Sequence, residues 1–285
     1  MINTTVNEFC TQILQSGDLK DKLATPPEGL TDDSREVYEI PDQPARSSKI
    51  RFSDKKSKIP RLEHLNQEIN RAVTLHHFAN HELLAIELFA YSLLKFQDAP
   101  RVIRKGLFRN LCDEQKHMKL YLARMEELGI GFGDRPLNHI FWKQIPGMNT
   151  LEKFCAVLSL TFEGANLDFS VLYREAFKEQ GDNKSSQIMD TVYKDEIKHV
   201  KRGLYVMRHS NLQKLNDWEC YQALLEKPLT PRRAKGYYYL PETRKRAGFD
   251  NFFIEGLGEY NDEFSVRKKE ILPYNLVNVS FVKNR

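Results

Sequence analysis

The chain has 285 residues and a mass of 33.4 kDa, a length that allows one or two domains. Hydrophobic residues make up 41% of it and charged residues 29%, which excludes a mostly disordered chain. The net charge of +4 conceals three unlike segments, because residues 1–44 carry nine acids and three bases, whereas 45–61 and 227–246 each carry seven bases and one acid.

The first 61 residues are expected to form an extension, a short helix plus an acidic and then a basic loop. Residues 4–16 have the apolar spacing of an amphipathic helix that ends at Gly17, and the Pro- and Asp-rich sequence that follows is typical of loop. The N-terminus lacks the basic start and apolar run of a secretory signal, so a cytoplasmic protein is expected. The four cysteines form no C-x-x-C pair and are expected to be reduced.

Four long segments with helical periodicity follow, and they predict an all-α fold. Short breaks at Pro100 and at Gly181 separate the members of each pair, and one long connection, 129–150, joins the pairs. This connectivity predicts a four-helix bundle over 62–210, built from two antiparallel hairpins and a crossover. The expected helices are 62–96, 100–128, 150–180 and 184–209.

The C-terminal segment, 211–285, contains four prolines and is expected to wrap around the bundle as short helices and irregular chain. The longest apolar stretch, LLAIELFAYSLL, contains Glu87 and is shorter than the ~20 residues of a membrane-spanning helix. We therefore expect no transmembrane segment and no membrane partner.

Two copies of Asp-Glu-x-Lys-His lie on the second and fourth predicted helices, CDEQKH at 112–117 and KDEIKH at 194–199. A single Glu-x-x-His is expected about once by chance in a chain of this composition, but two five-residue copies are not. Positions i and i+3 of a helix face the same way, so each copy presents one carboxylate and one imidazole on an apolar, inward stripe.

The first and third predicted helices each supply one inward acid, Glu82 and Glu163, on an apolar stripe. Buried carboxylates need a charge partner or a metal ion. From Glu82 to Glu163 is 81 residues, and from Glu114 to Glu196 is 82, so the second hairpin repeats the first. Four Glu and two His at the centre of a bundle form the ligand set of a carboxylate-bridged dimetal site, which favours iron, with manganese as the alternative, over zinc.

These motifs resemble the ferritin-like superfamily of diiron-carboxylate proteins. The segments HELLAIEL, DEQKH, FGD, DEIKH and RKRAGF are similar, more narrowly, to an uncharacterised bacterial branch of that superfamily, a domain of unknown function, up to about residue 255. Asn166 stands where some rubrerythrin-type members place a further carboxylate, and no rubredoxin-like C-x-x-C module is present, so a rubrerythrin-type peroxidase is not expected. The resemblance implies two iron ions held by Glu82, Glu114, His117, Glu163, Glu196 and His199.

Four further residues are expected around these ligands. Asp113 and Asp195 are predicted to accept the outer ring N–H of the histidine on the other helix, in crossed pairs with His199 and His117, or else to be solvated acids. Glu87 is predicted as an outer or salt-bridge residue, with the alternative that it replaces Glu82 as a ligand. Tyr121 is either a neighbour of the site or simple core. The histidines at 76, 77 and 81 crowd the same helix and are expected to be capped or at the surface, with the alternative that they reach the mouth of the site.

The leading functional hypothesis is an oxygenase or hydroxylase that activates O₂ with two Fe ions, acting on an unidentified small-molecule substrate with an external electron donor. The alternative is an iron-binding or ferroxidase protein without an organic substrate. A third hypothesis is a hydroxylase of tRNA or another nucleic acid that uses the basic, tyrosine-containing segment 227–246. We favour the interpretation of that segment as a strap that packs its aromatic residues on the bundle.

Overall fold

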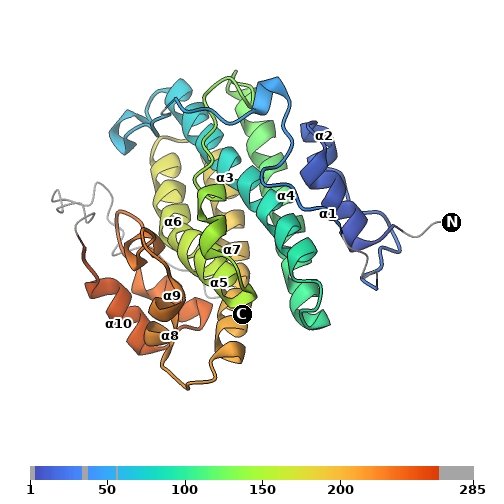
Figure 1. Ribbon diagram of the computed structural model, residues 1–285. Helices are drawn as coiled ribbons and strands as arrows, with labels where there is room; N and C mark the ends of the chain where they lie inside the picture. The colour runs from blue at the N-terminus through green and yellow to red at the C-terminus, as the bar shows by residue number, and fades with distance from the viewer. Residues whose placement is uncertain (1–3, 34–37, 56, 263–285) are drawn as a thin grey trace.

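The computed structural model describes residues 4–33, 38–55 and 57–262, and every regular element in these ranges is helical (Figure 1). Two isolated backbone bridges are the exceptions. The predicted all-α class is therefore confirmed. The elements are α1 Val6–Gln15, α2 Leu19–Lys22, η1 Ser48–Ile50, η2 Leu62–His64, α3 Glu68–Lys95, α4 Arg101–Glu127, η3 Trp142–Gly147, α5 Leu151–Cys155, η4 Ala156–Phe162, α6 Glu163–Glu179, α7 Asn183–Ser210, α8 Asp217–Leu224, η5 Pro231–Ala234, α9 Pro241–Ala247 and α10 Asn251–Glu259.

The long helices agree with the sequence periodicity, and their ends follow the predicted stop signals. Pro100 precedes α4, and Gly129 and Gly181 adopt left-handed φ angles of 75° and 73° after α4 and α6. The first long helix begins later than expected. Asn70 and Arg71 in its first turn donate hydrogen bonds to the carbonyl groups of residues 64 and 65, which holds the preceding residues in a separate turn.

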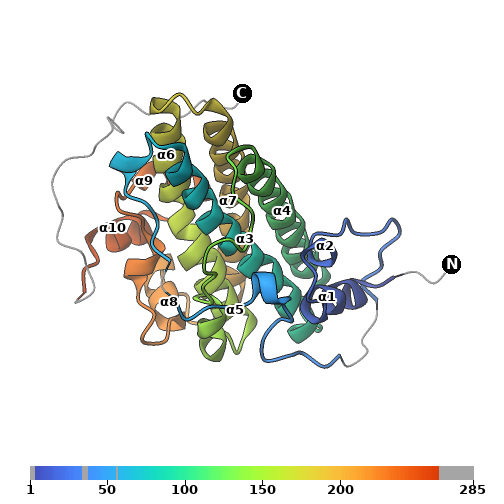
Figure 2. The ribbon, with the colours of Figure 1, turned by 90° about the horizontal axis from the view of Figure 1, so that it is seen from above.

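The long helices pack in two antiparallel pairs, α3 with α4 and α6 with α7, and α4 packs on α7 between the pairs (Figures 1 and 2). A short connection joins the helices of each pair, and the long connection from 128 to 150 joins the pairs. Inward apolar residues of these helices are almost completely buried, and they form the largest apolar core. Each pair thus brings an inward face toward the same interior.

The N-terminal helices α1 and α2 and the C-terminal helices α8, α9 and α10 lie on opposite sides of the long helices (Figures 1 and 2). Helix α1 packs on α3, and Arg104 of α4 binds Asp32 of the N-terminal segment with its Nη2 2.6 Å from Oδ1. On the other side, α8, α9 and α10 share a second apolar core with α6 and α7. Residues 227–247, which we call the C-terminal strap, cross α6. The part of the predicted C-terminal segment from 263 to 285 lies outside the described residues.

One helical stretch, Leu151–Glu179, has the length and composition to cross a membrane, with a mean hydropathy of 1.2 over its most apolar 18 residues. Of that window, 89% is buried inside the protein. This burial is typical of a core helix covered by other helices. The sequence prediction considered only the apolar stretch that contains Glu87, and it overlooked this one.

A π-helical segment, η4, interrupts the third long helix directly before Glu163. Such segments shift the register of a helix and are frequent at functional sites. Helix α7 approaches it closely at Gly203, where an added Cβ would lie 2.5 Å from Cβ of Ser159.

We expect Gly203→Ala to lower the free energy of unfolding by about 1–3 kcal/mol, because the extra methyl group overpacks this contact. The matched control is Gly106→Ala in α4, where the new Cβ would meet only the side chain of Arg202, at 3.5 Å from Cδ and 3.8 Å from Cγ. That control should raise stability by about 0.4–1 kcal/mol, since alanine restricts the unfolded chain. Urea denaturation measures both values, and equal effects of the two substitutions would contradict the close approach.

The N-terminus of α7 is fixed by Asp182, which is buried. Its Oδ1 accepts from the Ser185 backbone N–H at 3.0 Å and from Arg124 at 2.9 Å, and Oδ2 lies 3.1 Å from Nε of Arg71. Burial would raise the pKa of Asp182, but the hydrogen bonds from Ser185 and Arg124 hold it below its usual range.

Asp182→Asn keeps a good capping residue and removes the charge. We expect it to lower the free energy of unfolding by about 1.5–3 kcal/mol at pH 7. Because the folded pKa lies below the unfolded value of about 3.9, the stabilisation is complete above that pH and is lost as the pH falls through the folded pKa. The difference in urea midpoint between the metal-free wild type and the variant should therefore be smaller at pH 3 than at pH 7. A difference that is equally large at both pH values would count against the ion pairs.

Candidate metal centre

Four long helices each place one buried glutamate at the centre of the protein, and two of them add a buried histidine. Helix α3 supplies Glu82, and α6 begins with Glu163. The side chains form two overlapping groups in which the candidate ligand atoms lie within 4.8 Å of one another. One group is Glu114, Glu163, Glu196 and His199, and the other is Glu82, Glu114 and His117.

Glu114 belongs to both groups because its two oxygens face different histidines. Its Oε1 lies 2.9 Å from Nδ1 of His199, and its Oε2 lies 3.1 Å from Nδ1 of His117. Nδ1 of His117 is also 3.7 Å from Oε2 of Glu82. Nδ1 of His199 is 3.5 Å from Oε2 of Glu196 and 3.7 Å from Oε1 of Glu163. Glu114 therefore has the position of a carboxylate that bridges two neighbouring sites.

Several atoms that face the centre have no hydrogen-bond partner among the described residues. They are Oε1 of Glu114, both carboxylate oxygens of Glu163, Oε2 of Glu196 and Nδ1 of His199. A buried polar atom without a partner is costly, and a buried carboxylate more so. Carboxylate oxygens and imidazole nitrogens that converge within 3.7 Å without well-directed hydrogen bonds at these atoms suit a cation between them, so these residues fit a metal centre.

The pKa shifts show how the metal-free cluster holds its charge. Burial raises the pKa of Glu82 and of Glu163 well above the usual range. Burial alone would lower the pKa of both histidines. The hydrogen bond to Asp195 instead raises the pKa of His117, and the negative charge of Glu114 raises the pKa of His199, both well above the usual range. In the metal-free cluster, Glu82, Glu163 and the two histidines thus hold protons that metal binding must displace. Hydrogen bonds and the charge of His199 instead hold the pKa of Glu114 well below its usual range despite its burial.

Both predicted Asp–His pairs are present, and they cross between α4 and α7. Nε2 of His117 lies 3.2 Å from Oδ2 of Asp195, and Nε2 of His199 lies 3.2 Å from Oδ2 of Asp113. A carboxylate that accepts from Nε2–H leaves the lone pair of Nδ1 toward the cluster. The sequence interpretation missed Lys116, which forms an ion pair with each aspartate.

The sequence profile of a family described as "Protein of unknown function (DUF455)" matches residues 5–255, a range that contains all six clustered residues. The chain belongs to this family. An uncharacterized protein of Haemophilus influenzae is 26% identical to the DUF455 chain over 170 residues, which is 55% of the chain and 57% of that relative. The match thus spans little more than half of the relative's length, and no solved structure matches.

Glu87 lies outside both groups in this DUF455 protein, so the structure places Glu82 and not Glu87 at the centre. Its Oε1 is 3.1 Å from Nζ of Lys22, and its Oε2 is 2.7 Å from Nη2 of Arg46. Trp142 also donates to Oε2 at 3.3 Å. Of its two predicted roles, salt-bridge residue and metal ligand, Glu87 therefore has the first. Its ion pairs bind the N-terminal segment to α3.

Tyr121 is buried beside the centre and donates a hydrogen bond to Sδ of Met189 at 3.5 Å. Burial and the nearby charge of Glu82 raise the pKa of this tyrosine well above its usual range, so the hydroxyl stays protonated. Its ring also packs on Phe78, with 5.9 Å between centroids. Tyr121 thus combines the two expected roles, packing in the core and adjoining the site.

The prediction of surface histidines on α3 is wrong, because His76 and His77 are buried and His81 is half-buried. The long connection between α4 and α5 contacts His76 and His81, and His81 lines the small cavity beside Glu82. His76 is buried and accepts from the backbone N–H of Gly133 at 3.1 Å. His77 is buried beside Ser57, and His81 packs on Phe141 with 5.2 Å between ring centroids. Burial lowers the pKa of His76 and of His81 to about 4, which keeps both neutral at pH 7.

Asn166 hydrogen-bonds one of the clustered glutamates. Its Nδ2 donates to Oε1 of Glu196 at 2.8 Å, and the 81-residue repeat places Ala85 at the corresponding position of α3, where no such donor exists. The group around His117 has three members, whereas the group around His199 has four. A cavity of about 10 Å³, about the size of one water molecule, adjoins the smaller group at Glu82.

Proposed function

We propose that this protein is a ferritin-like four-helix bundle that holds two iron ions with the six clustered side chains. Two antiparallel helix pairs, joined by one long connection, support the fold. The observation that carries the metal proposal is the set of buried donor atoms without partners. Four carboxylates and two imidazoles suit iron, with manganese as the second choice.

We propose further that the protein is an O₂-activating oxygenase or hydroxylase of an organic substrate, with an external electron donor. When bound, two ferrous ions supply the electrons that reduce dioxygen. The protein's own residues then have three tasks. Glu114 holds both ions together, Asp113 and Asp195 fix the histidine rings, and the buried side chains around Tyr121 exclude bulk water.

The unequal halves of the centre support the oxygenase over a storage role. The group around His117 has fewer protein ligands than the group around His199. That group adjoins the cavity lined by Glu82, Tyr121, Asn166 and Phe169. A centre with fewer protein ligands beside a cavity keeps room for a small reactant, as open metal sites do.

The test is oxygen consumption by protein loaded anaerobically with ferrous iron and supplied with a chemical reductant. We expect continuing, reductant-dependent consumption by the wild type and its loss in Glu163→Ala. Oxygen consumption that stops after one burst, with uptake of more than about two irons per chain, would instead select a ferroxidase. No iron-dependent consumption in the wild type would refute both.

A further inference from the structure

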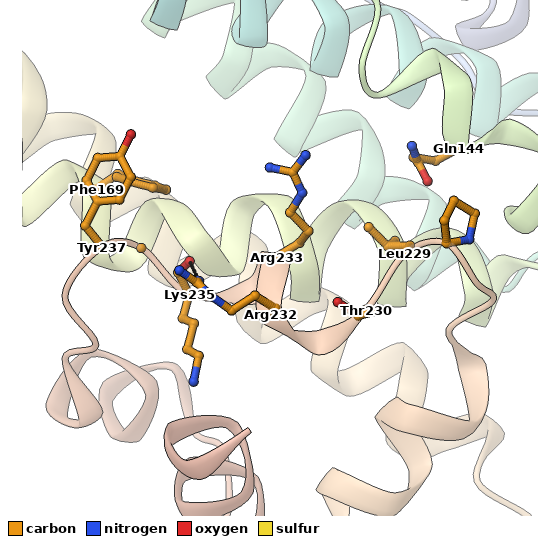
Figure 3. Close-up of a pocket in the computed structure, with 10 residues that line it drawn as sticks. Gln144, Phe169, Leu229, Thr230, Arg232, Arg233, Lys235 and Tyr237 are labelled. Carbon is orange, nitrogen blue, oxygen red and sulfur yellow. Dashed lines mark hydrogen bonds between the residues drawn. The ribbon is translucent and has the colours of Figure 1, made fainter. Parts of the chain in front are cut away.

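A pocket of about 530 Å³ lies between the C-terminal strap and α6 (Figure 3). Its volume falls in the range of about 300–1,000 Å³ that small-molecule sites occupy. The strap supplies most of the lining, α6 supplies Phe169, and Gln144 of η3 lies at the edge. The pocket therefore joins segments far apart in the sequence.

The pocket is lined by three cations and no acid. Two of the cations are already engaged, because Nζ of Lys235 donates to the carbonyl groups of Leu257, Gly258 and Tyr260, and Nη1 of Arg232 donates to the carbonyl of Lys235 at 3.2 Å. The backbone N–H of Arg233 donates to the carbonyl of Thr230 at 3.0 Å, but its guanidinium has no ion pair or hydrogen bond within the described part of the chain. Figure 3 shows its guanidinium pointing away from the strap, opposite to Lys235.

Apolar side chains complete the lining. The rings of Phe169 and Tyr237 meet edge to face, with 5.2 Å between centroids and 87° between planes. Pro228 and Leu229 line the other part of the pocket. A guanidinium beside aromatic and aliphatic walls suits an anion with an apolar body.

The strap that carries Arg233 is held firmly on α6. Asp168 accepts from the backbone N–H groups of Gly236 at 2.9 Å and Leu240 at 3.0 Å, and it forms a buried ion pair with Arg244. A Cβ at Gly236 would lie 2.8 Å from Cβ of Asp168, so the two segments are in close contact. The pocket is thus largely preformed.

Phe169 separates this pocket from the metal centre, because its ring lines both the pocket and the small cavity at Glu82. His81 also lines that cavity, and it is close enough to Arg233 to feel its charge. One aromatic side chain therefore stands between a cationic pocket and the half of the centre with fewer protein ligands.

We infer that this pocket binds the substrate, a small organic anion, with its carboxylate or phosphate on Arg233 and its apolar body beside Phe169. The inference deepens the proposed function, and rests on it, by naming the substrate class of the same centre. The anion is held at the strap, and the apolar end is directed toward the centre past Phe169.

The experiment measures binding of three matched probes by fluorescence titration: 1-naphthylacetate, 1-naphthyl phosphate and the neutral 1-naphthylacetamide. Iron-free and iron-loaded wild type should both bind at least one anion about tenfold more tightly than the amide, and the tighter anion distinguishes carboxylate from phosphate. Arg233→Met should weaken binding of that anion by about tenfold or more and leave the amide unchanged.

The matched control is Lys245→Met, which removes the same charge from an exposed position of the strap outside the pocket. It should change anion binding less than about twofold. Equal weakening by both substitutions, or equal affinity for the anions and the amide, would overturn the inference. Salt-sensitive binding of an RNA hairpin that both substitutions weaken, without competition from the probes, would overturn it in favour of a nucleic-acid surface.

A further variant tests the connection to the centre. In Mn²⁺-loaded protein, the proton resonances of the bound naphthyl probe should broaden, and Phe169→Ala should increase the broadening because it removes the wall between the two cavities. Unbroadened resonances of a bound probe in both proteins would refute the connection. Anion binding to iron-free protein needs no metal, so failure of the metal centre and failure of the pocket give different results.

Discussion

Glu114→Gln is expected to abolish reductant-dependent oxygen consumption. The variant should also be unable to hold two metal ions at the same time. The substitution keeps the shape of the side chain but removes the charge that faces Nδ1 of both histidines at 2.9 and 3.1 Å. Replacing a residue that only orients a metal ligand typically lowers metal affinity or activity about 10–100-fold. Glu114 is a shared ligand in this proposal, so its replacement should lower metal affinity or activity by more than about 100-fold.

The matched control is Glu126→Gln, an exposed position of the same helix. It should retain wild-type oxygen consumption and the wild-type rise in melting temperature on adding ferrous iron under nitrogen, whereas Glu114→Gln should lose both. Without metal, Glu114→Gln should be less stable than the wild type at pH 7, because Glu114 is the carboxylate that both buried histidines face, and its pKa lies well below the usual range despite its burial. A Glu114→Gln protein that retains iron-dependent activity would contradict the bridging role.

Arg244→Met is expected to have the largest effect on stability. Arg244 is fully buried, forms an ion pair with Asp168, and donates to the carbonyl groups of Gly164 at 2.9 Å and Ala234 at 2.7 Å. Methionine would leave the carboxylate of Asp168 buried without its cation, and breaking a buried pair costs about 3–5 kcal/mol. Burial already raises the pKa of Asp168, and loss of Arg244 should raise it further.

The double variant Arg244→Met with Asp168→Leu tests the origin of this effect. Replacing both partners of a buried ion pair by apolar residues is often nearly neutral, so the double variant should recover much of the stability that the single variant loses. Lys245→Met, an exposed neighbour, should change the free energy of unfolding by less than about 0.5 kcal/mol. A loss below about 1 kcal/mol in the single variant, measured by urea denaturation, would show that Arg244 does not hold the strap.

The long helices and the clustered residues were predictable because both depend on local periodicity. Apolar spacing identified the four helical stretches, and the i, i+3 rule placed Glu114 with His117 on one face. The 82-residue repeat then related the two helix pairs, so even the crossed contacts from Asp113 and Asp195 followed from the sequence.

What the sequence did not reveal depends on contacts between distant segments. Glu87 is neutralised by Lys22 and Arg46, which lie in a segment without regular periodicity, and Arg244 reaches Asp168 across 76 residues. The burial of His76 depends on the fold of the long connection. The π-helical segment η4 was not predicted for a different reason. Its apolar sequence fits a continuous α-helix equally well.

The role of Asn166 illustrates the limit of motif reasoning. The sequence marked it as a departure from a resembling family, but only the structure shows its amide bound to Glu196. That hydrogen bond depends on the packing of α6 against α7, which the identity of one residue does not reveal. The repeated motifs alone therefore do not predict it.

The central claim is that six side chains hold two ions, and native mass spectrometry of anaerobically iron-loaded protein tests it most directly. The account predicts that the wild type carries two irons per chain, matching the two groups, and that Glu114→Gln carries at most one. Wild-type protein with no bound iron, or a Glu114→Gln variant that still carries two, would contradict it.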